Sequence, residues 1–161
     1  MKLFDAHCHL QDPRLASRIA ETLARARAAG VARMLACGAA EDDWQAVGRL
    51  CAQHDDILPA FGLHPWYVGR RSESWLGMLT DLLADEPSAA IGEIGLDHAV
   101  RERNDAEQEE VFIAQLRLAK QMNRPACIHC RKAWDVLPDI LRSLRGLPAG
   151  FLLHSYSGSA E

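Results

Sequence analysis

Two histidines with one residue between them, His7 and His9, lie near the start of the chain. In an extended strand, residues two positions apart project from the same face, so both imidazoles can reach one point. Imidazole nitrogen is a common protein ligand for divalent ions such as zinc. A single histidine is more often packed in a core or exposed on a surface, but a pair with this spacing favours a metal site.

Glu93 is an acid within an otherwise apolar segment, residues 91–97, which reads Ile-Gly-Glu-Ile-Gly-Leu-Asp. Burying a carboxylate is costly unless it is hydrogen-bonded, paired or bound to a metal. A buried arginine or backbone amides could satisfy it. Because a carboxylate can also bridge two cations, and because the flanking glycines leave room for a ligand, we interpret Glu93 as a metal ligand.

More candidate ligands follow the later apolar segments. His64 follows residues 57–63, His129 and Arg131 end the segment that begins at residue 125, and His154 ends the last segment. The carboxyl ends of parallel strands face one side of an α/β fold, so we expect these side chains to converge. Arg131 could bind an anionic oxygen beside a metal ligand, or it could form a surface salt bridge.

The cysteines and tryptophans are interpreted as structural. Cys127 and Cys130 have a spacing found in zinc sites, but residues three apart on a strand point to opposite faces. We therefore expect both to be buried thiols, like Cys8. The tryptophans are expected in the core or on helix faces, and for Trp66 a place at the mouth of the site is the alternative. These tryptophans are Trp44, Trp66, Trp75 and Trp134.

Short apolar segments alternate with segments of helical periodicity. Strands are predicted at 2–6, 31–37, 57–63, 89–94, 125–129 and 150–154, and helices at 17–29, 41–54, 74–84, 104–122 and 133–144. Asn104 is expected to cap its helix with Glu107 as capping-box partner, and Pro138 to kink or break the last helix. The alternation predicts βαβ units and a parallel sheet, either an open one or part of a barrel.

Bulk composition narrows the function classes. The chain has 161 residues, about half of them apolar, and a net charge of −4, which excludes a basic coat that binds duplex without specificity. There is no apolar run long enough to span a bilayer, and no signal peptide is recognisable at the N-terminus. The five cysteines form a poor disulfide framework. We expect one cytoplasmic domain, residues 1–161.

Histidine and carboxylate ligands suit zinc, manganese and similar divalent ions. Two such ions close together would activate a water and stabilise a leaving oxygen. An arginine and a histidine beside them indicate an anionic substrate. The residues alone therefore predict a metal-assisted hydrolase, with a phosphate ester as the first candidate.

The same residues carry a family resemblance. Five segments, in order along the chain, resemble the signatures of TatD-family metal-dependent deoxyribonucleases, which are built on (β/α)8 barrels. These segments are Phe4–Leu10, Gly62–Pro65, Ile91–Asp97, Ile128–Arg131 and Leu153–Gly158. Each segment alone is modestly specific, but the set of five spans the whole chain.

The resemblance implies a two-metal site that takes zinc, manganese or magnesium. The first ion would be held by His7, His9 and Glu93. Glu93 would bridge to a second ion, which His129 and His154 would hold. The scissile phosphate would be contacted by His64 and Arg131. The implied reaction is hydrolysis of DNA phosphodiester bonds, with a 3′ end as a candidate starting point.

One departure from the family pattern concerns the end of the chain. The family continues with a strand that carries an aspartate, which completes the first metal shell, whereas this sequence ends at Glu161. We therefore expect the N-terminal portion of a barrel, truncated at its C-terminus, with about six strands and five helices. An open sheet edge after the sixth strand would favour self-association.

Two alternatives remain open. One is an amidohydrolase or carboxylic esterase, including an enzyme that deacylates aminoacyl-tRNA. Such relatives often bridge their metals with a carbamylated lysine, but none of the lysines, Lys2, Lys120 and Lys132, ends the fourth apolar segment. The other alternative is a non-catalytic truncated fragment that keeps a metal-binding surface.

Overall fold

The computed structural model describes residues 1–158. Within them, six strands alternate with helices. The strands are β1 (Leu3–Cys8), β2 (Val31–Cys37), β3 (Ile57–Phe61), β4 (Ala90–Asp97), β5 (Ala126–Arg131) and β6 (Phe151–Leu153). The α-helices are α1 (Ile19–Ala28), α2 (Glu41–Gln53), α3 (Trp75–Asp85), α4 (Asp105–Gln121) and α5 (Leu137–Ser143). Two 3-10 helices, η1 (Pro13–Arg18) and η2 (Pro65–Arg70), follow β1 and β3.

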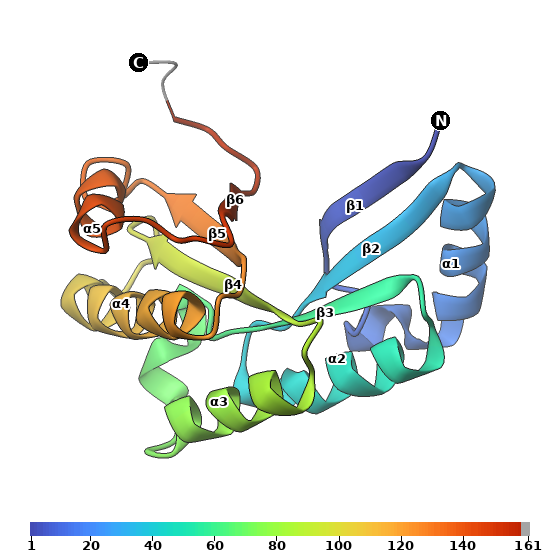
Figure 1. Ribbon diagram of the computed structural model, residues 1–161, viewed down its shortest axis with the longest axis horizontal. Helices are drawn as coiled ribbons and strands as arrows, with labels where there is room; N and C mark the ends of the chain where they lie inside the picture. Colours follow the sequence, from blue (N-terminus) through green and yellow to red (C-terminus); the bar gives the residue numbers. More distant parts are fainter. Residues whose placement is uncertain (159–161) are drawn as a thin grey trace.

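The six strands form one parallel sheet in the order β1-β2-β3-β4-β5-β6. The sheet is curled into part of a barrel, with the helices along its outer side (Figure 1). Because each strand pairs in parallel with the next one in the chain, every connection must cross over from one end of the sheet to the other, and it does so through a helix. The prediction of an incomplete (β/α)8-type barrel with about six strands and five helices is confirmed for the described residues.

The main core lies between the sheet and the helices. All eight residues of β4 are buried, as expected for a central parallel strand that is covered on both faces. In α4, the buried face includes Val111, Phe112 and Leu116 at helical spacing. A separate small cluster on the inner face of the sheet consists of Cys37, Ala60, Ala90 and Cys127.

Two local predictions were wrong. Helix α5 begins at Leu137, so Pro138 lies in the first turn rather than in the helix interior. A proline there loses no helical hydrogen bond and causes no kink. Asn104 precedes α4, but its side chain does not cap the helix. Its amide instead donates to Glu107 and accepts a hydrogen bond from Gln108.

Two glutamines on α4 fix the backbone that carries the candidate site. The side chain of Gln115 accepts from the amide of Leu63 at 2.7 Å and donates to its carbonyl at 3.1 Å. Gln108 makes the same pair of contacts with the backbone of Asp97, at 2.8 and 3.2 Å. Both glutamines are fully buried.

Among the described residues, no helix has the length and apolar character of a membrane span.

Candidate metal centre

Glu93 lies in β4 with histidines on both sides of its carboxylate. Its Oε2 atom lies 3.3 Å from Nε2 of His7 and 3.2 Å from Nε2 of His9. The two Nε2 atoms are 3.2 Å apart. The prediction that both imidazoles reach one point is therefore confirmed, although β1 ends at Cys8 and His9 lies just beyond the strand.

The other carboxylate oxygen faces three more histidines. Glu93 Oε1 lies 2.7 Å from His154 Nε2, 3.0 Å from His129 Nδ1 and 3.4 Å from His64 Nε2. His64 lies three residues after the end of β3, His154 directly follows β6, and His129 lies within β5. The curled parallel sheet thus gathers five imidazoles around one acid, which is only 4% exposed.

The electrostatics of the cluster follow from this packing. Burial alone would raise the pKa of Glu93, but hydrogen bonds from His129 and His154 outweigh burial and hold that pKa well below its usual range. Burial also lowers the pKa of His7, yet its contacts with Cys127 and Glu93 prevail and raise the pKa to about 9. A buried acid held in its anionic form beside histidines with shifted pKa values is typical of a functional site.

Hydrogen bonds on the outer side of the cluster orient two of the rings. His9 Nδ1 lies 2.8 Å from the carbonyl oxygen of Cys37, which can only accept, so Nδ1 carries a proton and the neutral form of the ring has its lone pair on Nε2. His129 Nε2 lies 3.2 Å from Asp97 Oδ2, so the neutral form of this ring keeps its proton on Nε2 and has its lone pair on Nδ1. Outer partners of this kind fix metal-binding histidines in the ligating tautomer.

His64 has the opposite arrangement. Its Nδ1 accepts the backbone N–H of Trp66 at 3.1 Å, so its proton lies on Nε2, which faces Glu93. Burial lowers the pKa of His64 and keeps the ring neutral. A neutral ring with this tautomer donates through Nε2 and cannot ligate through it without turning over. His64 is therefore equipped to donate to an anionic oxygen.

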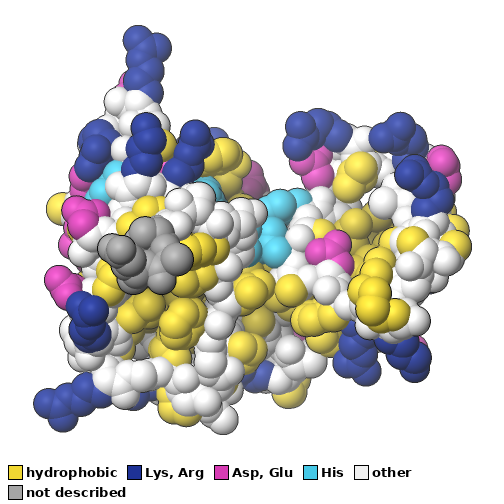
Figure 2. All heavy atoms as spheres, turned by 90° about the horizontal axis from the view of Figure 1, so that it is seen from above, with side chains coloured by type: hydrophobic (Ala, Val, Ile, Leu, Met, Phe, Trp, Pro, Cys, Tyr) yellow, Lys and Arg dark blue, Asp and Glu magenta, His cyan; other side chains and the backbone are white. Residues whose placement is uncertain are grey.

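The site opens into a cleft of about 500 Å³, lined by His9, Arg14, His64, Trp66, Arg70 and Glu93, among others. Figure 2 shows histidine side chains in the hollow between the two raised sides of the molecule. Groups with ligand atoms within 4.8 Å of one another are His7–Glu93–His154 and His64–Glu93–His129. Histidine nitrogens and a carboxylate oxygen fit a divalent ion such as zinc or manganese.

Trp66 and Arg131 occupy the rim. Trp66 is 56% exposed, so its expected place in the core was wrong. Its indole N–H donates to Asp97 Oδ2 at 2.7 Å. The side chain of Arg131 lines a separate hollow of about 230 Å³ together with Trp66, Asp97 and Arg101. Arg131 thus lies beside the histidine cluster and outside its inner contacts.

Sequence reasoning missed three neighbours of the ligands. Asp97 ends β4, three residues beyond the predicted strand, and its contact with His129 was not foreseen. Cys127 is buried as predicted, and its sulfur also lies 3.1 Å from His7 Nδ1. Cys37 completes a group with these two residues. Alternation along β5 was a usable signal, because it places Cys127 and His129 on the same face.

Comparison with known proteins gives a consistent result. The family model described as TatD related DNase matches residues 4–161. A Bacillus subtilis protein named uncharacterized metal-dependent hydrolase YabD is 33% identical over 99% of this chain and 62% of its own length. The 3′-5′ ssDNA/RNA exonuclease TatD of Pantoea ananatis is also 33% identical, with the same coverage. The chain therefore spans about 62% of the length of these relatives.

Solved structures agree on the fold. The crystal structure of YjjV, a TatD homologue from Escherichia coli, superposes with a TM-score of 0.92 at 30% identity, covering 98% of this chain and 61% of that one. A TatD-family hydrolase from Entamoeba histolytica superposes with a TM-score of 0.88 at 20% identity, covering 99% and 60%. The second match supports the fold alone.

Proposed function

The chain belongs to the family of TatD-related DNases, and on that premise we propose that its Glu93-centred site hydrolyses phosphodiester bonds of DNA with divalent metal ions. Single-stranded DNA and RNA, which the names of several relatives specify, are the first substrates to test. The observation that carries the proposal is the convergence of five imidazoles on one buried carboxylate. We propose that residues 1–161 act as one unit.

In this proposal, His7, His9 and Glu93 hold one ion, and Glu93 with His129 and His154 holds the other. The ligating tautomers of His9 and His129 support this assignment. Zinc and manganese suit such ligands better than magnesium, which prefers oxygen. Two bound divalent ions would supply an activated water and stabilise charge on the leaving oxygen.

The protein's own side chains position the substrate. His64 donates from Nε2 to an oxygen of the scissile phosphate, because its Nδ1 is already occupied by the amide of Trp66. Arg131 binds a neighbouring phosphate from the rim, where it lines a hollow with Trp66. The exposed indole of Trp66 offers a surface on which an unpaired base can stack.

The test is cleavage of 3′-labelled single-stranded DNA by the purified chain with Mn²⁺ or Zn²⁺, beside bis(p-nitrophenyl) phosphate and a panel of carboxylic esters. We expect phosphodiester cleavage that a chelator or Glu93→Gln removes, while Glu110→Gln on the exposed side of α4 leaves it intact. Preference for carboxylic esters would favour the amidohydrolase alternative. Metal binding without hydrolysis would favour the non-catalytic alternative.

We also propose that the chain self-associates through its edge strands. Four large apolar side chains are exposed on β1 and β6, namely Leu3, Phe4, Phe151 and Leu152. Edge strands with exposed apolar side chains readily pair with another chain. Light scattering after size-exclusion chromatography should give a dimer or larger species, and a monomer over a wide concentration range would contradict this.

A cytoplasmic location is proposed because all five cysteines are free thiols.

A further inference from the structure

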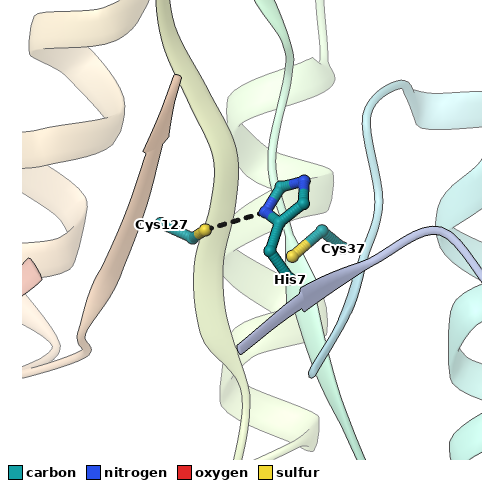
Figure 3. A group of neighbouring side chains, drawn as sticks. All are labelled: His7, Cys37 and Cys127. Carbon is teal, nitrogen blue, oxygen red and sulfur yellow. Dashed lines mark hydrogen bonds between the residues drawn. The ribbon is translucent and has the colours of Figure 1, made fainter. Parts of the chain in front are cut away.

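Two buried thiols lie against the metal-ligand candidate His7. Cys37 ends β2 and Cys127 lies in β5, two strands that are not neighbours in the sheet. The curl of the sheet brings their side chains together with His7 from β1, and Figure 3 shows the three side chains gathered around one point. The proposed hydrolysis uses neither sulfur.

The spacing of the three ligand atoms suits a small metal ion. His7 Nδ1 lies 3.1 Å from Cys127 Sγ, and Nδ1 and both sulfurs lie within 4.8 Å of one another. Zinc–sulfur bonds of about 2.3 Å and zinc–nitrogen bonds of about 2.0 Å, at tetrahedral angles, place nitrogen and sulfur about 3.5 Å apart and two sulfurs about 3.8 Å apart. Small side-chain rotations would therefore reach ligand geometry.

Charge and ligand chemistry select the kind of ion. Cys37 and Cys127 are 0% and 1% exposed, so an uncompensated charge among them would be costly. Two thiolates cancel the charge of a divalent cation, and the imidazole binds as a neutral ligand. The two thiol protons leave to solvent. Thiolate ligands favour soft ions and disfavour magnesium, calcium and manganese.

We propose that His7, Cys37 and Cys127 form a second metal site, selective for a soft divalent ion such as zinc or cadmium. His7 ligates this site through Nδ1, which requires its remaining proton on Nε2. The Glu93-centred site requires the opposite tautomer, with Nε2 unprotonated. A neutral imidazole has one lone pair for ligation, so a soft ion held by the sulfurs withdraws His7 from the Glu93-centred site.

The competing explanation is that Cys127 only accepts a hydrogen bond from His7 and orients its ring, with Cys37 as packing. The two explanations differ in whether sulfur enters the coordination shell of an added ion. Ultraviolet absorption from sulfur-to-metal charge transfer reports this directly. The signal is independent of hydrolysis, so the outcome does not depend on the proposed function.

The experiment is a Cd²⁺ titration of the reduced chain, followed by this absorption. We expect a band that saturates near one equivalent and that falls at least tenfold in Cys37→Ser and in Cys127→Ser. Cys51→Ser changes a thiol on α2 and should keep the full band. Cadmium X-ray absorption of the unmodified chain, which needs no variant to fold, should show sulfur bound to the ion. No band and no bound sulfur, or a full band in both serine variants, would overturn the proposal.

Discussion

His154 Nε2 lies 2.7 Å from Glu93 Oε1, although 61 residues separate them in the chain. The contact joins the end of β6 to the middle of β4 across the inner face of the curled sheet. His7 stacks on the His154 ring, with centroids 3.8 Å apart. His7 from the first described strand and His154, which follows the last one, therefore meet at one carboxylate, and the site depends on the curl of the whole sheet.

Removing histidines in pairs should separate the two proposed ion positions. The double variant His7→Ala with His9→Ala should lose about one bound ion per chain, and His129→Ala with His154→Ala should lose the other, because each pair holds a different ion with Glu93. Elemental analysis after dialysis against Mn²⁺ gives the stoichiometry. Substituting His54, which lies outside the cluster at the end of α2, is the control. Equal and complete loss in both pairs would contradict separate positions.

Gln115→Ala should destabilise the fold by about 2–4 kcal/mol, because it leaves the buried amide and carbonyl of Leu63 without partners at about 1–3 kcal/mol each. Urea unfolding measures the difference in free energy. Gln121→Ala, at an exposed position on the same helix, should stay within about 0.5 kcal/mol of the unmodified chain. Similar effects at both positions would show that the contact with Leu63 contributes little.

Gly95→Ala should cost at least about 4 kcal/mol or prevent folding. A Cβ atom at Gly95 would lie 1.9 Å from the carbonyl oxygen of His129, and its φ of +143° disfavours any other residue. Gly77 in α3 has nothing within 4 Å of its added Cβ, so Gly77→Ala should stabilise the fold by up to about 1 kcal/mol. Thermal melts of both variants test the pair, and a folded Gly95→Ala variant with an unchanged melting temperature would refute the close approach.

The Arg71–Glu107 ion pair joins η2 to α4, and hydrogen bonds from Arg71 and Asn104 lower the pKa of Glu107. A lowered pKa in the folded state stabilises the fold above the ordinary value of 4.5 and loses that effect as the pH falls. Glu107→Gln should therefore cost up to about 1 kcal/mol at pH 7, and the cost should be smaller at pH 3, below the ordinary pKa of the side chain. Unfolding at both pH values, with Glu110→Gln as control, checks this. A cost that is equal at both pH values would exclude the ion pair as its cause.

Much of the site was predictable because parallel strands present their carboxyl ends on one side. That rule alone placed His64, Glu93, His129 and His154 near one another. It could not give the contact of Cys37 with Cys127, which depends on how strongly the sheet curls between β2 and β5. It also could not place Trp66, whose exposure depends on the 3-10 turn after His64 and on a hydrogen bond to Asp97.

The local errors have a common origin. Asn104 matched the sequence pattern of a helix cap, but buried Gln108 offers its side chain a competing partner. Pro138 matched a break within a helix, but the segment before it does not join α5, so the proline lies in the first turn. In both cases the sequence pattern allowed more than one local arrangement, and for Asn104 the outcome goes with the burial of Gln108 against the backbone of Asp97.

The central claim is that Glu93 is the shared ligand of a divalent-metal site. The most direct measurement is the metal content of the purified chain and of Glu93→Gln after saturation with Mn²⁺ and dialysis, with Glu110→Gln as the matched control. We predict stoichiometric Mn²⁺ in the unmodified chain and in Glu110→Gln, and at least a tenfold loss in Glu93→Gln. Equal metal content in all three proteins, or no bound metal in any of them, would contradict the account.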